Sequence, residues 1–156
     1  MHFRLFIKYA YSYIKINDND ILFRYVKLKA AKFIFEEEIY MKIGVTEISP
    51  RTVQQVAEKK FKEGYYCCEA LVSAIRDEFK LDVPEEVIAM ASGMAVGAGK
   101  SGCVCGAFNG GILALGLFFG RTEQDGPTNP KSVKCMELTK ELHDWFKKAN
   151  GKNAIC

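Results

Sequence analysis

A regular stripe of small residues in the second half of the chain constrains the fold more than any other feature of the sequence. The stripe has one member every four residues: Gly102, Gly106, Gly110 and Ala114. That spacing places all four on one face of a helix, where a second backbone or a flat ligand can approach closely. We therefore predict a glycine-rich central helix over about residues 104–119. The spacing alone leaves tight helix packing and ligand contact as alternatives.

The sequence after the first 40 residues has a helical period throughout. Apolar residues recur at intervals of three and four, and capping and glycine residues bound the runs. The first predicted helix begins at Ser49 or Thr52 and ends at Gly64. The other predicted helices cover residues 66–79, 84–92, 104–119 and 131–149. We expect Asp82 to cap the third of these helices. The inward face of the last helix is expected to hold Leu138, Leu142, Trp145 and Ala149. With no strand predicted, the fold class is all-α, a small single-domain bundle of about five helices.

The segment Gly99-Lys100-Ser101 looks like the end of a phosphate-binding P-loop. The P-loop pattern needs a further glycine five residues before Gly99, where this chain has Met94. It also needs a buried strand before the loop, whereas the preceding residues predict a helix. The sequence therefore disfavours a P-loop NTPase.

Composition excludes several other classes. Charged residues make up 26% of the chain and apolar residues 49%, which is ordinary for a globular protein, and a net charge of +3 is too small to predict nucleic-acid binding. The uncharged run between Lys100 and Arg121 is interrupted by glycines, and its helical part is shorter than the roughly 20 apolar residues of a membrane span. No signal peptide is visible, so we expect a cytoplasmic protein whose six cysteines are metal ligands or reactive thiols.

Residues 1–40 differ sharply in composition from the rest. They hold ten of the nineteen aromatic residues but no glycine or cysteine. Glu36-Glu37-Glu38, shortly before Met41, can be encoded by a purine-rich ribosome-binding sequence. We expect residues 1–40 to be an N-terminal extension, either a translated leader or an aromatic, basic helix, and residues 41–156 to form the cysteine-containing helical domain.

Cys105 occupies the most informative position among the cysteines. It stands where the glycine-rich turn becomes the central helix, and free N–H groups at a helix start stabilise a thiolate. Lys100 adds a nearby positive charge. We expect a lowered pKa for Cys105 and the fastest alkylation of any cysteine in the chain. An inert thiol buried by helix packing is the alternative.

The other cysteines and the histidines give weaker signals. Cys103 precedes Cys105 in a C-x-C pattern, and in a turn the two could share a metal ion. Cys67 and Cys68 are adjacent, so only one is expected to join a site, and Cys68 fits the core face of its helix. Cys135 is expected to be structural, and His143 to lie at the surface.

The residues around these cysteines are similar to those of a known family. The similar stretches are FKEGYYCCEALVSAI, GAGKSGCVCGAFNGGILALGLFFGR and ELHDWFKKANGKNAIC. With its core Cys105-Gly106-Ala107-x-x-Gly110, the chain resembles the redox-active proteins named for their C_GCAxxG_C_C cysteine pattern. The resemblance implies that Cys67, Cys105 and Cys156 are the first three of four family cysteines. The fourth would lie further on, so we expect a chain truncated at its C-terminus.

The resemblance implies redox or metal chemistry, with the chain accessory to an oxidoreductase or transport system. A thiol-based oxidoreductase would use Cys105, Cys67 and Cys156, whereas zinc or an iron–sulfur cluster would be held by the same three with Cys103 as a possible fourth. A bound cofactor would approach Gly102, Gly106 and Gly110. No C-x-x-C-H motif is present, so covalent haem is not implied. The alternative is a non-catalytic helical partner subunit with structural cysteines, whose glycine stripe packs against an oxidoreductase or a second copy of the chain.

Overall fold

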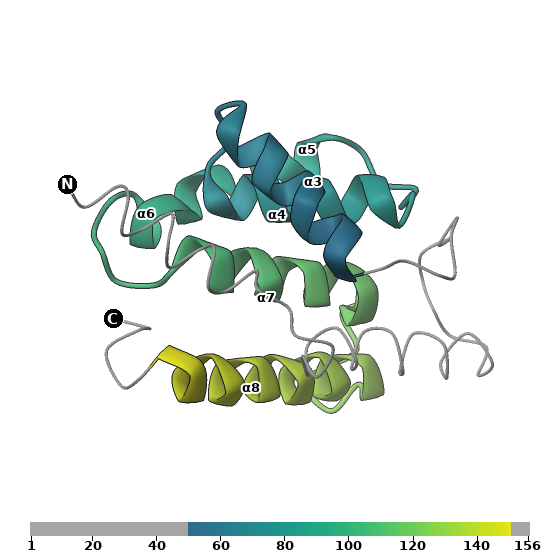
Figure 1. Ribbon diagram of the computed structural model, residues 1–156. Helices are drawn as coiled ribbons and strands as arrows, with labels where there is room; N and C mark the ends of the chain where they lie inside the picture. The colour runs from purple at the N-terminus through teal and green to yellow at the C-terminus, as the bar shows by residue number, and fades with distance from the viewer. Residues whose placement is uncertain (1–49, 151–156) are drawn as a thin grey trace.

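Three helical layers stack with the glycine-rich helix in the middle (Figure 1). The computed structural model describes residues 50–150, and every regular element in that range is helical. The elements are α3 (Pro50–Lys62), α4 (Cys67–Glu78), α5 (Glu86–Ala89), η1 (Ser92–Met94), α6 (Ala95–Ala98), α7 (Gly106–Phe119) and α8 (Pro130–Asn150). Helices α3 and α4 lie on one side of α7, and α8 lies on the other. The all-α prediction is confirmed, while the extension at residues 1–40 lies outside the described residues.

The ends of the long helices follow local signals in the sequence. Gly64, just beyond α3, has a φ of +116°, which favours glycine. At the start of α4, the Tyr66 N–H donates to the Glu69 carboxylate at 2.8 Å. At the start of α8, the Asn129 side-chain oxygen accepts from the Lys131 N–H at 2.8 Å. These contacts satisfy backbone groups that a helix end leaves without an intrahelical partner.

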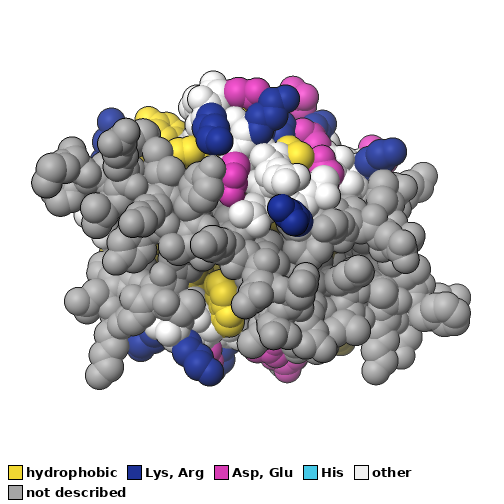
Figure 2. Space-filling model, viewed as in Figure 1, with side chains coloured by type: hydrophobic (Ala, Val, Ile, Leu, Met, Phe, Trp, Pro, Cys, Tyr) yellow, Lys and Arg dark blue, Asp and Glu magenta, His cyan; other side chains and the backbone are white. Residues whose placement is uncertain are grey.

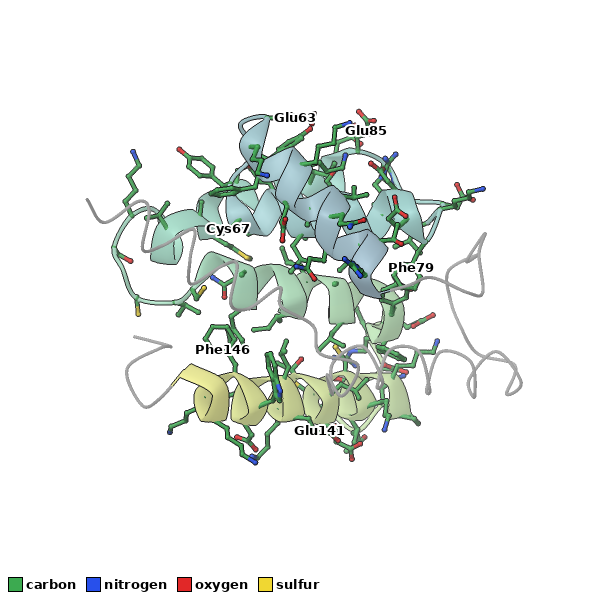
Figure 3. The ribbon with its side chains drawn as sticks, viewed as in Figure 1. Glu63, Cys67, Phe79, Glu85, Glu141 and Phe146 are labelled. Atoms are coloured by element: carbon green, nitrogen blue, oxygen red, sulfur yellow. The ribbon has the colours of Figure 1, made fainter. Side chains whose placement is uncertain are left out.

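Aromatic contacts join the layers through α7. The rings of Phe79 and Phe118 meet edge to face with centroids 5.1 Å apart, and those of Phe108 and Phe146 lie 4.9 Å apart. Figure 3 shows Phe146 pointing from α8 toward α7. The inward face expected for α8 is confirmed at Leu138 and Leu142, which are buried, and Trp145 packs partly buried against the core. The side chain of Ala149 lies outside the described residues.

The part of the glycine stripe that lies on α7 is covered by α4. Gly102, which was expected on the same helix face, lies before α7 with a φ of +72° and is not helical. A Cβ atom added at Gly110 would lie 3.1 Å from the Cys68 carbonyl oxygen and 3.2 Å from the Cys68 Cα. On another side of the helix, a Cβ at Gly111 would lie 3.1 Å from the Leu142 Cδ2 of α8. Of the two alternatives that the stripe left open, tight helix packing is therefore the one found at Gly110.

The third predicted helix differs from the sequence expectation. It was expected over residues 84–92 with Asp82 as its cap, but α5 begins at Glu86, follows Glu85 as its N-cap residue and ends at Ala89. The chain then bends through η1, which buries Ala91 completely beneath α4. Burial of this small residue, rather than local propensity, decides where the helix stops.

A run of left-handed backbone follows η1. The φ angles of five consecutive residues are positive: Val96 (50°), Gly97 (74°), Ala98 (58°), Gly99 (66°) and Lys100 (69°). Only glycine adopts this region without strain, and a β-branched residue such as Val96 is an outlier there. The segment thus holds strain at three non-glycine positions.

Ala98→Gly is expected to stabilise the protein by about 0.5–1 kcal/mol, because glycine removes a left-handed cost larger than its own entropic cost. Ala98 is exposed, so no packing is lost. The matched control is Ala89→Gly at the exposed end of right-handed α5, which should destabilise by about the same amount. Denaturant unfolding shows whether the free energy of unfolding rises or falls in each variant. A loss of stability in Ala98→Gly would contradict the left-handed geometry.

Two further features of the described residues are the distribution of surface charge and the length of the helices. On the part of the face in Figure 2 that the structure describes, basic and acidic side chains are mixed rather than segregated by sign. In residues 50–150, no helix has the length and apolar character needed to cross a membrane.

Candidate functional site

The site is built where the start of α4 meets the start of α7. Cys67 is the first residue of α4, and Figure 3 shows its side chain pointing toward the N-terminal end of α7. A Cβ atom at Gly106 would overlap the Cys67 Sγ. The missing side chain at Gly106 therefore makes the space in which the Cys67 sulfur sits. Because Cys105 directly precedes Gly106, the fold brings two cysteines distant in sequence to one place.

The surroundings of Cys67 favour its thiolate form. Its pKa is lowered from 9.0 to about 6, chiefly by a hydrogen bond from the Cys68 side chain. Partial burial opposes this shift, while the Val96 N–H and the N–H groups of Cys67 and Cys68 add to the lowering. The N–H groups of Cys67 and Cys68 belong to the first turn of α4, where a helix offers them no intrahelical acceptor. At neutral pH, Cys67 is thus mostly a thiolate.

Cys105 behaves oppositely to the sequence prediction. It is the N-cap residue of α7, and the N–H groups of Phe108 and Ala107 act to lower its pKa. Burial outweighs these hydrogen bonds, and the negative charge of Cys67 acts in the same direction, so the pKa of Cys105 is raised. The predicted thiolate at Cys105 is therefore wrong. A helix start supplies donors at both cysteines, but burial and a neighbouring charge decide between them.

Cys68 is the innermost cysteine. It has no exposed surface, as its predicted core position required, and its Sγ donates to the Ala91 carbonyl oxygen at 3.0 Å. Its side chain also hydrogen-bonds to that of Cys67, and this contact, together with burial, raises the pKa of Cys68. The two adjacent cysteines act on each other's pKa, and the expectation that only one of them joins a site stays a prediction.

A residue of the left-handed turn also acts on Cys67. The N–H of Val96, whose φ is positive, helps to lower the pKa of Cys67. Gly97 is packed so closely against the turn that a Cβ there would lie 2.6 Å from the Cys103 nitrogen. Strained backbone is commonly retained at sites where it orients a functional group. Here that group is an N–H donor to a thiolate.

The remaining predicted residues lie outside this cluster or outside the described range. Cys103 is exposed, and Gly102 has open space where a Cβ would stand. Cys135 is half-buried on α8, where burial raises its pKa, and the partly exposed His143 lies 3.1 Å from Asp144. In residues 50–150, no three His, Cys, Asp or Glu side chains are grouped so that they could hold a metal ion. Since Cys156 lies outside that range, the predicted metal set of Cys67, Cys105, Cys156 and Cys103 stays a prediction.

Comparison with known proteins identifies the family. Residues 65–156, more than half of the chain, match the family model described as "Putative redox-active protein (C_GCAxxG_C_C)". The chain belongs to this family. No curated protein and no solved structure matches it. The matched range contains Cys67 at the start of α4 and Cys105 just before α7, and the resemblance seen in the cysteine pattern is confirmed.

The sequence predicted a lowered pKa at Cys105, whereas the structure lowers the pKa at Cys67 and raises it at Cys105. Cys67 stood at the beginning of a predicted helix just as Cys105 did, so the same helix-end argument applied to it. The contribution of Val96 had no sequence signal, because a valine does not predict positive φ. Only the glycines around it marked an unusual turn.

Proposed function

We propose that this C_GCAxxG_C_C protein exchanges thiols and disulfides, with Cys67 as the attacking thiolate and Cys105 as the resolving thiol. The observation that carries the proposal is the position of the Cys67 sulfur, which lies against Gly106 and beside Cys105. In this position the pKa of Cys67 is lowered to about 6. A thiolate near neutral pH is the reactive form in disulfide exchange.

The exchange has two balanced steps. The Cys67 thiolate attacks one sulfur of a partner's disulfide, forms a mixed disulfide and releases the partner's other sulfur as a thiolate. Cys105 then loses its proton to that released thiolate or to solvent and attacks the Cys67 sulfur. The Cys67–Cys105 disulfide forms, and the second partner thiolate leaves. The partner disulfide is reduced by two electrons and the cysteine pair is oxidised; the reverse steps restore the reduced pair.

The charge coupling between the two cysteines gives these steps an order. While Cys67 is a thiolate, its charge helps to keep Cys105 protonated. In the mixed disulfide, Cys67 carries no charge. The effect of that charge in keeping Cys105 protonated is therefore gone when Cys105 must attack. Tyr65 and Tyr66, immediately before Cys67, are exposed and offer ring surface for the partner segment that carries the disulfide. An oxidoreductase or transport component in the cytoplasm would supply that segment, as the family resemblance implies.

Alkylation of the reduced full chain with limiting iodoacetamide tests the thiolate assignment. At pH 5.5, Cys67 should react tens of times faster than a cysteine of ordinary pKa, after its lower intrinsic nucleophilicity is included. Mass-spectrometric mapping of the labelled peptides measures the order. Faster labelling of Cys105 or Cys103 would overturn the assignment.

Oxidation with one equivalent of oxidised glutathione tests the resolving role. The wild type should yield a Cys67–Cys105 linked peptide, whereas Cys105→Ser should accumulate glutathione on Cys67. Cys135→Ser is the matched control and should behave as the wild type, because Cys135 lies on α8 and does not act on Cys67. A wild-type protein in which another pair is linked would refute the proposed exchange.

A further inference from the structure

Exposed apolar side chains gather around the end of α4 that carries Cys67. In residues 50–150, five large hydrophobic side chains are exposed. Two of them, Tyr65 and Tyr66, directly precede Cys67, and a third, Met90, is 67% exposed. The proposed exchange leaves Met90 without a role and leaves the chemistry of the partner segment open.

The chain that follows α5 lies across the start of α4. Its Ala91 carbonyl oxygen accepts a hydrogen bond from the Cys68 Sγ at 3.0 Å. The Ser92 hydroxyl donates to one oxygen of the Glu69 carboxylate, and the other oxygen accepts from the Tyr66 N–H at 2.8 Å. One carboxylate thus ties the two stretches that carry the exposed side chains to each other. Figure 1 shows this chain continuing into α6 beside the N-terminal ends of α4 and α7.

Both stretches are free of charge. No charged residue occurs in residues 64–68 or in residues 87–99, although charged residues make up 26% of the chain. Lys60, whose Nζ lies 6.0 Å from the centre of the Tyr65 ring, is paired with Asp77 at 2.7 Å. The two stretches therefore offer no counter-charge to a charged ligand. Their exposed tyrosine and methionine side chains favour apolar contact, because an aromatic ring supplies a large contact area and methionine adapts its shape to different partners.

Resting on the proposed exchange, we propose that Tyr65, Tyr66 and Met90 form a docking surface for an extended polypeptide whose disulfide is flanked by uncharged, apolar residues. The occupant has to bring a disulfide, because Cys67 lies at this surface. The residues beside its cysteines supply the apolar contacts, and its neutrality matches that of the two stretches. Oxidised glutathione, which is small, charged and without apolar side chains, suits the surface poorly.

The rates at which Cys67 reacts with three disulfides test this surface. The probes are the disulfide-linked dimers of acetyl-Leu-Cys-Leu-amide and of acetyl-Ser-Cys-Ser-amide, and oxidised glutathione. The two peptides are equally uncharged and have the same kind of leaving group, so the ratio of their rate constants does not depend on the intrinsic reactivity of Cys67. In the reduced full chain, the leucine peptide should react with Cys67 about ten- to a hundredfold faster than the serine peptide, because docking buries apolar surface. Oxidised glutathione should react no faster than the serine peptide. Quenching by alkylation and mass-spectrometric mapping measure each rate at Cys67.

Two variants test which residues make the surface. Tyr66→Ser and Met90→Ser should each lower the preference for the leucine peptide several-fold. Serine keeps the N–H that is donated to Glu69 and is a favoured N-cap residue, so α4 keeps its start. Met136→Ser is the matched control: Met136 is 69% exposed but lies on α8, so its substitution should leave the preference unchanged.

The outcomes separate this proposal from the exchange on which it rests. If Cys67 forms a mixed disulfide with none of the three probes, the proposed exchange itself fails. Equal rates with the two peptides would overturn the docking surface alone, as would a preference that survives both substitutions. An equal loss in Met136→Ser would show nonspecific apolar adsorption, and a preference that falls as the protein concentration rises would show a second copy of the chain on the surface. Either result would also overturn the proposed occupant.

Discussion

Gly110→Leu is expected to lower the free energy of unfolding by about 1–3 kcal/mol. The first added atom would press on the carbonyl oxygen and Cα of Cys68, at 3.1 and 3.2 Å, and on the Leu71 side chain at 3.3 Å. Backbone atoms in the first turn of α4 cannot rotate away as a side chain can, so α4 and α7 must separate. Denaturant unfolding monitored by circular dichroism measures the loss.

Gly116→Leu is the matched control, since it makes the same change on the same helix. Gly116 is exposed, and a Cβ there meets nothing within 4 Å. Leucine has a higher helix propensity than glycine, so this variant should be as stable as the wild type or more stable by up to about 1 kcal/mol. Equal effects at the two positions would mean that α4 does not cover the stripe.

The free energy of unfolding of the reduced protein is expected to rise as the pH increases from about 6 to 9, because of Cys67. In the folded state its pKa is about 6, whereas in the unfolded chain it has the ordinary value of 9.0. Between these values the unfolded chain binds the proton and the folded protein does not, so stability increases with pH. One such group contributes at most about 1.4 kcal/mol per pH unit.

The same linkage predicts the opposite trend at higher pH. The pKa values of Cys68, Cys105 and Cys135 are raised by burial or by a neighbouring thiol, so these groups remain protonated in the fold after the unfolded chain has lost their protons. Stability should therefore fall above about pH 9. Urea titrations of wild type and Cys67→Ser across this range measure both trends, and the variant should lose the rise but keep the fall. A rise that persists in Cys67→Ser would assign it to another group.

Local sequence patterns predicted most of the helices well, because each of these helices is specified by residues close together in the sequence. The apolar spacing of α4 and α8 and the glycine after α3 marked those elements to within a few residues. The third helix was mispredicted because its end is set by the burial of Ala91 beneath α4, a contact between distant segments. The glycine stripe predicted close packing on α7 but could not name α4 as its cover, since spacing within one helix carries no information about which helix lies opposite.

The sequence by itself determined an all-α domain of this family, a helix face without side chains, and cysteines at two helix starts. All of these follow from residue order along a single segment. Only the tertiary structure decided that the pKa is lowered at Cys67 and raised at Cys105. A thiol's pKa depends on its burial and on the donors and charges around its sulfur, and here they come from separate segments: the Val96 N–H of a left-handed turn and the space above Gly106 of α7.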